Sequence, residues 1–214
     1  MAPDLRGYGR TGKPAGGYDK RSMAGDIRGL MDYLGEGRAA LVGHDRGARV
    51  ATRFAKDYPG MIDRLVVMDN IPTREIYASM DAAKARAHWF FIFNSAPDLP
   101  EALIAGREET WLRYILQGWT CRGACSDYRA GSIDVQQDEQ DAGTQISCPT
   151  LALWGEDFEL VGKMWDVEGI WRAMAADISF APIPRCGHLP HEERPDLVNQ
   201  SLLDFLQPWK APGG

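Results

Sequence analysis

Hydrophobic and polar residues follow two periodicities along the chain, and the pattern predicts strands separated by helices. Four short apolar runs have the length and composition of buried strands, and they lie at residues 39–42, 64–68, 150–154 and 178–183. Apolar residues recur with helical spacing at residues 22–34, 48–58, 164–176 and 196–206. Strands that alternate with helices build a parallel sheet with helices on its faces. The pattern therefore predicts an α/β fold.

The pattern changes between residues 72 and 147, where strand-like runs are absent. Two long Ala-, Leu- and aromatic-containing segments, residues 74–93 and 100–119, predict helices. We expect this helical insertion to form a cap over the carboxyl ends of the strands, where α/β sheets bind ligands. The predicted organisation is a core made of residues 1–71 and 146–214, interrupted by a helical cap at residues 72–145.

Composition excludes several classes of protein. The chain has 214 residues, enough for one domain or a core with a modest insertion, and its net charge is −6. The acidic balance and the scattered Lys and Arg residues argue against a nucleic-acid partner. No apolar stretch approaches bilayer length and the first residues lack a signal-peptide core, so we expect no membrane partner and a cytoplasmic location.

The cysteines and histidines do not predict a metal site. The four cysteines lack the close paired spacing of zinc ligands, and they stand at positions 121, 125, 148 and 186. His188 and His191 are separated by Pro190, which disfavours a helical metal-binding face. We therefore expect reduced, partly buried thiols and neither metal nor cofactor.

The candidate chemistry lies where the first predicted strand meets a helix. Gly43-x-Asp45-x-Gly47 stands at this junction, the context of a nucleophile elbow, and we expect both glycines to be required by crowding in the turn. Asp45 occupies the place that Ser takes in hydrolases of esters and amides. A carboxylate is already ionised at neutral pH and can displace a leaving group from an sp3 carbon, which forms an ester. The motif thus predicts attack on carbon–halogen bonds or epoxides.

With these features the chain resembles the haloacetate (fluoroacetate) dehalogenases of the α/β-hydrolase superfamily. The matching segments are residues 43–49, 64–73, 88–91, 127–131, 151–155 and 186–188. The resemblance covers essentially all 214 residues but begins at the loop after the family's fourth strand. It implies a partial, mostly parallel α/β-hydrolase fold with a helical cap, without the three preceding strands and a second oxyanion-hole amide. The implied reaction is cofactor-free hydrolysis of short 2-haloacids such as haloacetate.

The resemblance also implies a catalytic triad. Asp45 is the expected nucleophile, and His188, after the last strand, is the expected base for the water that cleaves the ester. Two residues compete for the acid that orients this imidazole. Asp69 follows the second strand, where these dehalogenases carry their acid, and Asp157 follows the third, where many other α/β hydrolases carry theirs. Position favours Asp69, because the usual place of the acid after the third strand holds Phe158.

Five further residues are expected to bind the substrate. Arg46 and Arg49 lie in the first helical turn after the nucleophile, where paired guanidinium groups can hold a haloacid carboxylate. His88, Trp89 and Tyr128 match the family's halide-binding set, whose N–H and O–H donors stabilise the departing anion. The expected partner is therefore a small anionic substrate. Epoxide hydrolases and haloalkane dehalogenases usually carry Trp after the nucleophile, because their substrates are neutral.

Two alternatives stay open. An epoxide hydrolase on the same core would need two cap tyrosines directed at the ring oxygen. The second alternative is a truncated, inactive hydrolase homologue or a binding protein. It stays open because the resemblance lacks the second oxyanion-hole amide, and the loss of one such donor typically costs about 10²–10³ in rate. The bare edge of the first strand further predicts self-association, for example as a homodimer, or insolubility.

Overall fold

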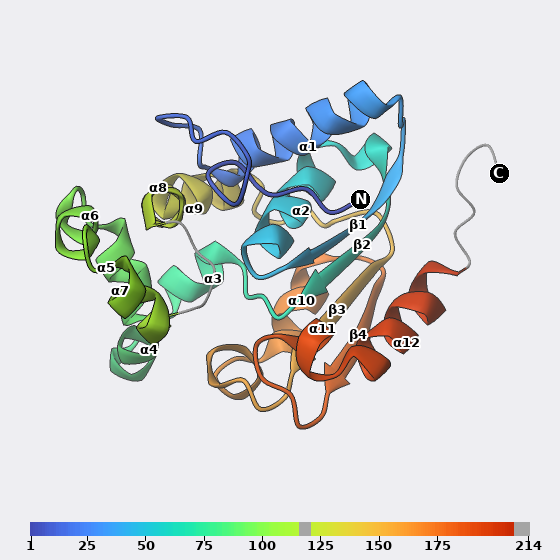
Figure 1. Cartoon of the computed structure of the whole chain (residues 1–214). Coiled ribbons are helices and arrows are strands. Elements are labelled where there is room, and N and C mark those ends of the chain that lie inside the picture. The colour runs from blue at the N-terminus through green and yellow to red at the C-terminus, as the bar shows by residue number, and fades with distance from the viewer. Residues whose placement is uncertain (116–120, 208–214) are drawn as a thin grey trace.

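A four-stranded parallel sheet forms the centre of the computed structural model, which describes residues 1–115 and 121–207 (Figure 1). The strands run in the order β1 (Ala39–His44), β2 (Ile62–Met68), β3 (Thr150–Gly155) and β4 (Ile178–Ile183). The register pairs Leu41 with Leu65 and Ala152 with Phe180. All four predicted strands are confirmed, and β1 and β2 are each two residues longer than predicted. β1 forms one edge of the sheet.

Both faces of the sheet are covered by helices. Side chains of β2 alternate, so that Leu65 and Val67 pack in one core cluster while Val66 and Met68 pack in the other. The helices of the first face are α1 (Lys20–Leu34), α2 (Arg46–Asp57) and α10 (Val167–Met174), and the helix of the second is α12 (Pro195–Leu206). This double burial explains why the strands read as continuous apolar runs.

The first helix starts earlier than predicted. Asp19 is its N-cap: the carboxylate accepts the backbone N–H of Ser22 at 3.0 Å and its hydroxyl at 2.7 Å. The predicted start at Ser22 was therefore wrong, because Ser22 lies within the first turn. The helix ends as predicted at Gly35, whose φ of 74° suits a glycine.

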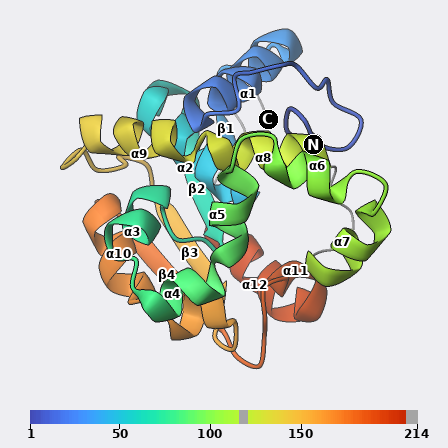
Figure 2. The same cartoon turned by 90° about the vertical axis from the view of Figure 1, so that its left-hand side faces the viewer.

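Within the described residues, only helices connect β2 to β3. They are α3 (Thr73–Ala78), α4 (Ala82–Ala87), α5 (Trp89–Ser95), α6 (Leu99–Ile104), α7 (Glu108–Ile115), α8 (Cys121–Arg129) and α9 (Gly131–Gln140). Figure 1 shows α4 to α8 beside the sheet, and Figure 2 views the molecule from the side on which they lie. The single helix predicted at 74–93 was wrong: Asp81 caps a new helix by accepting the N–H groups of Ala83 and Lys84. Gly106 (φ 77°) separates α6 from α7, and residues 116–119 of the predicted helix at 100–119 lie outside the described residues. The domain division at residues 72 and 145 stays a prediction.

A buried ionic cluster fastens this insertion to the core. The carboxylate of Asp127, on α8, accepts a hydrogen bond from Tyr8 Oη at 2.8 Å and from Arg46 Nε at 2.7 Å. It also pairs with the ammonium group of Lys20, which lies 3.2 Å from Asp134. Asp127 is fully buried. Removing one member of such a cluster leaves an uncompensated buried charge, which typically costs 3–5 kcal/mol, so the cluster holds α8 firmly against α1 and α2.

The remaining elements complete the connections between strands and helices. They are η1 (Pro59–Met61), the short π-helix η2 (Glu159–Lys163) and α11 (Pro190–Glu193). The helix predicted at 164–176 is shorter, because Asp166 caps it by accepting the N–H of Gly169 at 3.0 Å. Across the described chain, no helix has both the length and the apolar surface that spanning a bilayer requires.

Candidate active site

The elbow after β1 has the geometry that its sequence predicts. Asp45 lies between β1 and α2 with φ 45° and ψ −111°, a sparsely populated conformation that typically costs about 1–3 kcal/mol. A Cβ at Gly43 would lie 2.5 Å from the carbonyl oxygen of Gly47, so this glycine is required. The same expectation for Gly47 was wrong, because a Cβ there would meet no atom within 4 Å.

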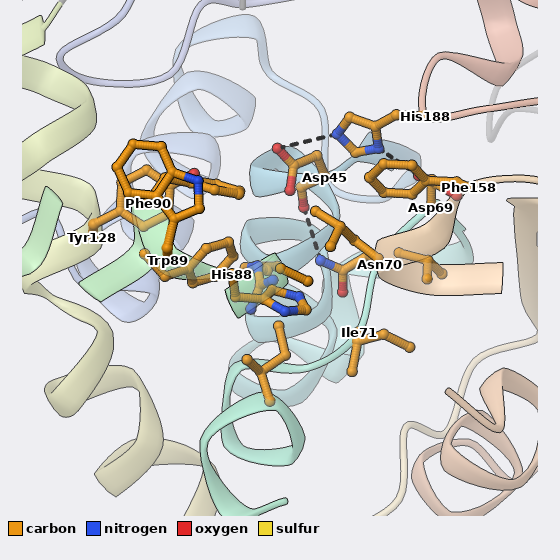
Figure 3. Close-up of a pocket in the computed structure, with 16 residues that line it drawn as sticks. Asp45, Asp69, Asn70, Ile71, His88, Trp89, Phe90, Tyr128, Phe158 and His188 are labelled. Carbon is orange, nitrogen blue, oxygen red and sulfur yellow. Dashed lines mark hydrogen bonds and ion pairs between the residues drawn. The ribbon is translucent and has the colours of Figure 1, made fainter. Parts of the chain in front are cut away.

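Three side chains from different strand ends meet at this elbow. His188 Nε2 lies 3.8 Å from Asp45 Oδ2, and His188 Nδ1 donates a hydrogen bond to Asp69 Oδ2 (Figure 3). The other oxygen of Asp69 accepts the backbone N–H of Gly155 at 3.1 Å, which fixes the carboxylate. Asp157 is largely exposed and lies 3.5 Å from Lys163. The structure therefore places Asp69, and not Asp157, against the imidazole.

Phe158 occupies the place where the acid stands in many α/β hydrolases. Its ring stacks on His188 with a centroid distance of 4.4 Å and an interplanar angle of 20°. The imidazole is thus held by a carboxylate at its edge and by an aromatic ring at its face. From the sequence, position 158 was recognised only as lacking the usual acid. The packing of Phe158 against His188 was not predicted.

Asp45 and His188 rest as an ion pair. Burial alone would lower the pKa of His188, but the contact with the Asp45 carboxylate, the hydrogen bond to Asp69 and the charges of both residues outweigh it and raise the pKa to about 10. Burial alone would raise the pKa of Asp45, but His188 and then Arg49 and Arg46 hold it well below its usual range. The candidate nucleophile is accordingly ionised across the neutral range.

This ion pair predicts a pH-dependent stability. Folded His188 keeps a proton that the unfolded imidazole releases above its ordinary pKa of 6.5. The stabilisation is therefore complete below pH 6.5 and is lost as the pH rises toward 10. We expect the midpoint of thermal unfolding to fall over this window more steeply in the wild type than in His188→Gln. Circular dichroism melts at pH 6 to 9.5 measure the difference, and parallel curves would contradict the prediction.

A cavity of about 360 Å³ lies beside the nucleophile, within the size range of small-molecule sites. Figure 3 shows Trp89, Phe90 and Tyr128 on one side of it and Ile71 and Phe158 on the other. Its polar lining residues are Asp45, Arg49, Asp69, Asn70, His88 and His188. The cavity is thus mostly apolar, and its polar groups include the three side chains that meet at the elbow.

Arg49 brings a buried positive charge to this cavity. Its side chain is almost fully buried, and its Nη1 donates to the hydroxyl of Thr73 at 2.6 Å. Within the described chain no carboxylate oxygen lies within ion-pair distance of its guanidinium, and its Nε has no hydrogen-bond partner. Burial, followed by the charge of Arg46, lowers the pKa of Arg49. A guanidinium in this state has unused capacity to bind an anion.

Arg46 lies elsewhere. Its Nε donates to Asp127 at 2.7 Å, and its guanidinium stacks over the ring of Tyr128 at 4.5 Å from the centroid. It does not line the cavity that Arg49 lines. The structure therefore brings one of the two expected arginines to the cavity, because the buried carboxylate of Asp127 engages the other. Arg46 still acts on the site through its charge, which helps to lower the pKa of Asp45.

The three expected halide-binding residues all line the cavity. The Nδ1–H of His88 donates to the carbonyl of Lys84 at 3.0 Å, so the neutral ring presents Nε2 as an acceptor. Burial and the charges of Arg49 and Lys84 lower the pKa of His88, which favours that neutral form. Burial raises the pKa of Tyr128, so its hydroxyl stays protonated. Tyr128 and Trp89 carry an O–H and an indole N–H, which are groups that can donate a hydrogen bond.

One group of potential metal ligands lies in the described chain, namely His44, Asp69 and His188. The side chains of Asp69 and His188 already form a hydrogen bond with each other. His44 Nε2 donates to the backbone carbonyl of His188 at 2.7 Å. We therefore assign no metal to this group. The thiols of Cys125, Cys148 and Cys186 are buried as predicted, and the side chain of Cys121 lies outside the described residues.

Comparison with known proteins agrees with this geometry. A fluoroacetate dehalogenase from Burkholderia sp is 36% identical over 96% of this chain and 77% of its own length. A soluble epoxide hydrolase from Corynebacterium sp. (strain C12) is 30% identical over 97% of this chain and 80% of its own length. The crystal structure of Cfl2 from Burkholderia cenocepacia superposes with a TM-score of 0.84 at 29% identity, covering 95% of this chain and 77% of that one. The sequence profile of the alpha/beta hydrolase family matches residues 1–201, and the chain belongs to this family.

Proposed function

We propose that the protein hydrolyses the carbon–halogen bond of short 2-haloacids such as haloacetate. The supporting observation is the buried guanidinium of Arg49, which faces the cavity of a carboxylate nucleophile and has no carboxylate partner within the described chain. A buried charge without an ion-pair partner is costly, and a substrate carboxylate would supply that partner. With a neutral substrate, the guanidinium would interact only with more distant carboxylates such as that of Asp45.

The first step forms an ester. A carboxylate oxygen of Asp45 attacks C2 of the haloacid, the carbon–halogen bond breaks, and the halide leaves with the bonding electrons. Arg49 holds the substrate carboxylate and offsets its repulsion by the nucleophile. Tyr128 and Trp89 donate hydrogen bonds to the leaving halide, whose charge grows in the transition state.

The second step returns the free enzyme. Esterification removes the negative charge of Asp45, so the main interaction that raises the pKa of His188 is lost and the imidazole can release its proton. Neutral His188 then deprotonates a water that attacks the carbonyl carbon of the ester, and Asp69 stabilises the imidazolium that forms. Collapse releases glycolate from haloacetate and regenerates the carboxylate. In sum, haloacetate and water yield glycolate, halide and one proton.

Epoxide hydrolysis is the competing reaction, because epoxide hydrolases are also among the relatives. The ring oxygen of an epoxide needs a proton donor. Of the described side chains, Tyr128 is the one tyrosine that lines the cavity, whereas the epoxide reaction was expected to use two. The charge of Arg49 also has no role toward a neutral epoxide. Both features favour the haloacid.

Arg49→Gln tests the anionic substrate directly. We expect the wild type to release halide from chloroacetate faster than it converts styrene oxide or 1-chlorobutane. Loss of the charged hydrogen bond should raise KM for chloroacetate about 10- to 100-fold, in line with roughly 1.5–3 kcal/mol for such a bond. Conversion of the neutral substrates should change little. Halide electrode and diol assays measure both reactions.

Arg53→Gln is the matched control. Arg53 lies one turn along α2, is equally buried, and pairs with Asp57 and Asp141. Its removal should lower stability without raising KM for chloroacetate. A preference of the wild type for styrene oxide, or an unchanged KM in Arg49→Gln, would contradict the proposed substrate.

A further inference from the structure

Asn70 connects the candidate triad acid to the backbone of the nucleophile. It follows Asp69 directly, is almost fully buried, and donates a hydrogen bond from Nδ2 to the carbonyl oxygen of Asp45 at 3.0 Å (Figure 3). The same carbonyl accepts the backbone N–H of Arg49 at 3.3 Å, a long bond for a first helical turn. The side chain of Asn70 therefore supplies the shorter of the two bonds that hold this carbonyl.

Asn70 is itself firmly held. Its backbone carbonyl accepts the indole N–H of Trp171 at 3.2 Å, and Trp171 is a fully buried core residue of α10. The preceding residue, Asp69, donates its backbone N–H to the carbonyl of Leu153 at 2.7 Å. The backbone at Asn70 is thus held from β3 and from α10, and the buried side chain extends from this held backbone to the elbow.

The elbow needs such support. The backbone of Asp45 has a strained conformation, and it sets the direction of the carboxylate. That carboxylate must reach C2 of the substrate on one side, while its ester must lie near water activated by His188 on the other. Reacting atoms must approach within about 3–3.5 Å in line, and a displacement of 1 Å can cost about 10²-fold in rate.

We propose that Asn70 is a positioning residue, whose side-chain amide holds the carbonyl of Asp45 so that the carboxylate stays aligned with both the cavity and His188. One dipeptide then carries two tasks: Asp69 orients the base and Asn70 orients the nucleophile. The inference rests on the proposed function only in that Asp45 is the nucleophile.

Asn70→Ala and Asn70→Leu test the inference, because both remove the donor and Leu keeps the approximate shape. We expect kcat for chloroacetate to fall about 10- to 100-fold. KM should stay within about twofold, because Arg49 and Thr73 are untouched. In a His188→Gln background, the rate of ester formation on Asp45 should fall by the same factor. Steady-state halide release and timed mass spectrometry measure these quantities.

A stability control separates positioning from general destabilisation. Val66→Ala creates a cavity in β2, within the core cluster that includes Val198 of α12, and should lower the unfolding midpoint with kcat retained. A kcat within threefold of the wild type in both Asn70 variants, or a loss confined to KM, would overturn the inference. A loss of kcat in Val66→Ala equal to theirs would also overturn it. Absence of halide release by the folded wild type would instead refute the proposed function, and the Asn70 ratios would then be measured with styrene oxide.

Discussion

Asp45→Asn is expected to abolish halide release, with a loss of at least about 10⁴-fold in kcat. The amide has the same shape and tolerates the positive φ of the elbow, but it carries no negative charge with which to displace a halide. Because folding is expected to persist, the loss would report on chemistry and not on structure. Halide release from chloroacetate, with circular dichroism of the same sample, measures both.

The same substitution has a second expected signature. Without the charge at position 45, the pKa of His188 should fall from about 10 toward its ordinary value. Nuclear magnetic resonance titration of the imidazole detects this change. Retention of substantial halide release by folded Asp45→Asn would rule out Asp45 as the nucleophile, whatever the substrate.

His188→Gln is expected to stop turnover after one equivalent of halide. Displacement by Asp45 does not require the base, whereas hydrolysis of the ester does, so the enzyme should accumulate as an ester of Asp45. Intact-mass spectrometry should show the addition of one carboxymethyl group after incubation with chloroacetate, and peptide mapping should place it on Asp45. The steady-state rate should fall at least about 10⁴-fold.

Asp157→Asn serves as the control for this experiment. This carboxylate is exposed and lies away from the imidazole, so the variant should turn over normally and carry no added mass. Equal accumulation of ester in wild type and His188→Gln would show that His188 is not the base of the second step.

The sheet could be predicted from sequence because its strands are buried on both faces. Val66 and Val67 face opposite sides of β2, yet both need an apolar side chain, so the strand reads as an uninterrupted run. The elbow could also be predicted, because the turn requires glycine at position 43 and this requirement is visible in the local sequence. The preference for Asp69 over Asp157 came from the family resemblance and from Phe158, which stands in the usual place of the acid after the third strand. The structure places Asp69 against His188.

Features that depend on distant partners were not predictable. The ionic cluster draws Arg46 to Asp127, and these residues lie 81 positions apart in the sequence. Some local hydrogen bonds were not predictable either: His88 directs its Nδ1–H to the carbonyl of Lys84, four residues earlier, which leaves Nε2 as an acceptor. The breaks in the predicted helix at 74–93 reflect the capping carboxylate of Asp81, whose effect helical spacing does not reveal.

The ionic cluster around Asp127 also restricts how a ligand can reach the nucleophile. If the whole insertion swung outward as a rigid lid, Asp127 would leave Lys20 and Arg46 as bare charges in a dry interface. By contrast, the contacts of α4 with the core include a cation–π interaction between Lys84 and Trp165 at 4.1 Å. Such a contact can break and form again in milliseconds or less. A ligand should therefore enter and leave the cavity on the α4 side, while the α8 side stays fixed.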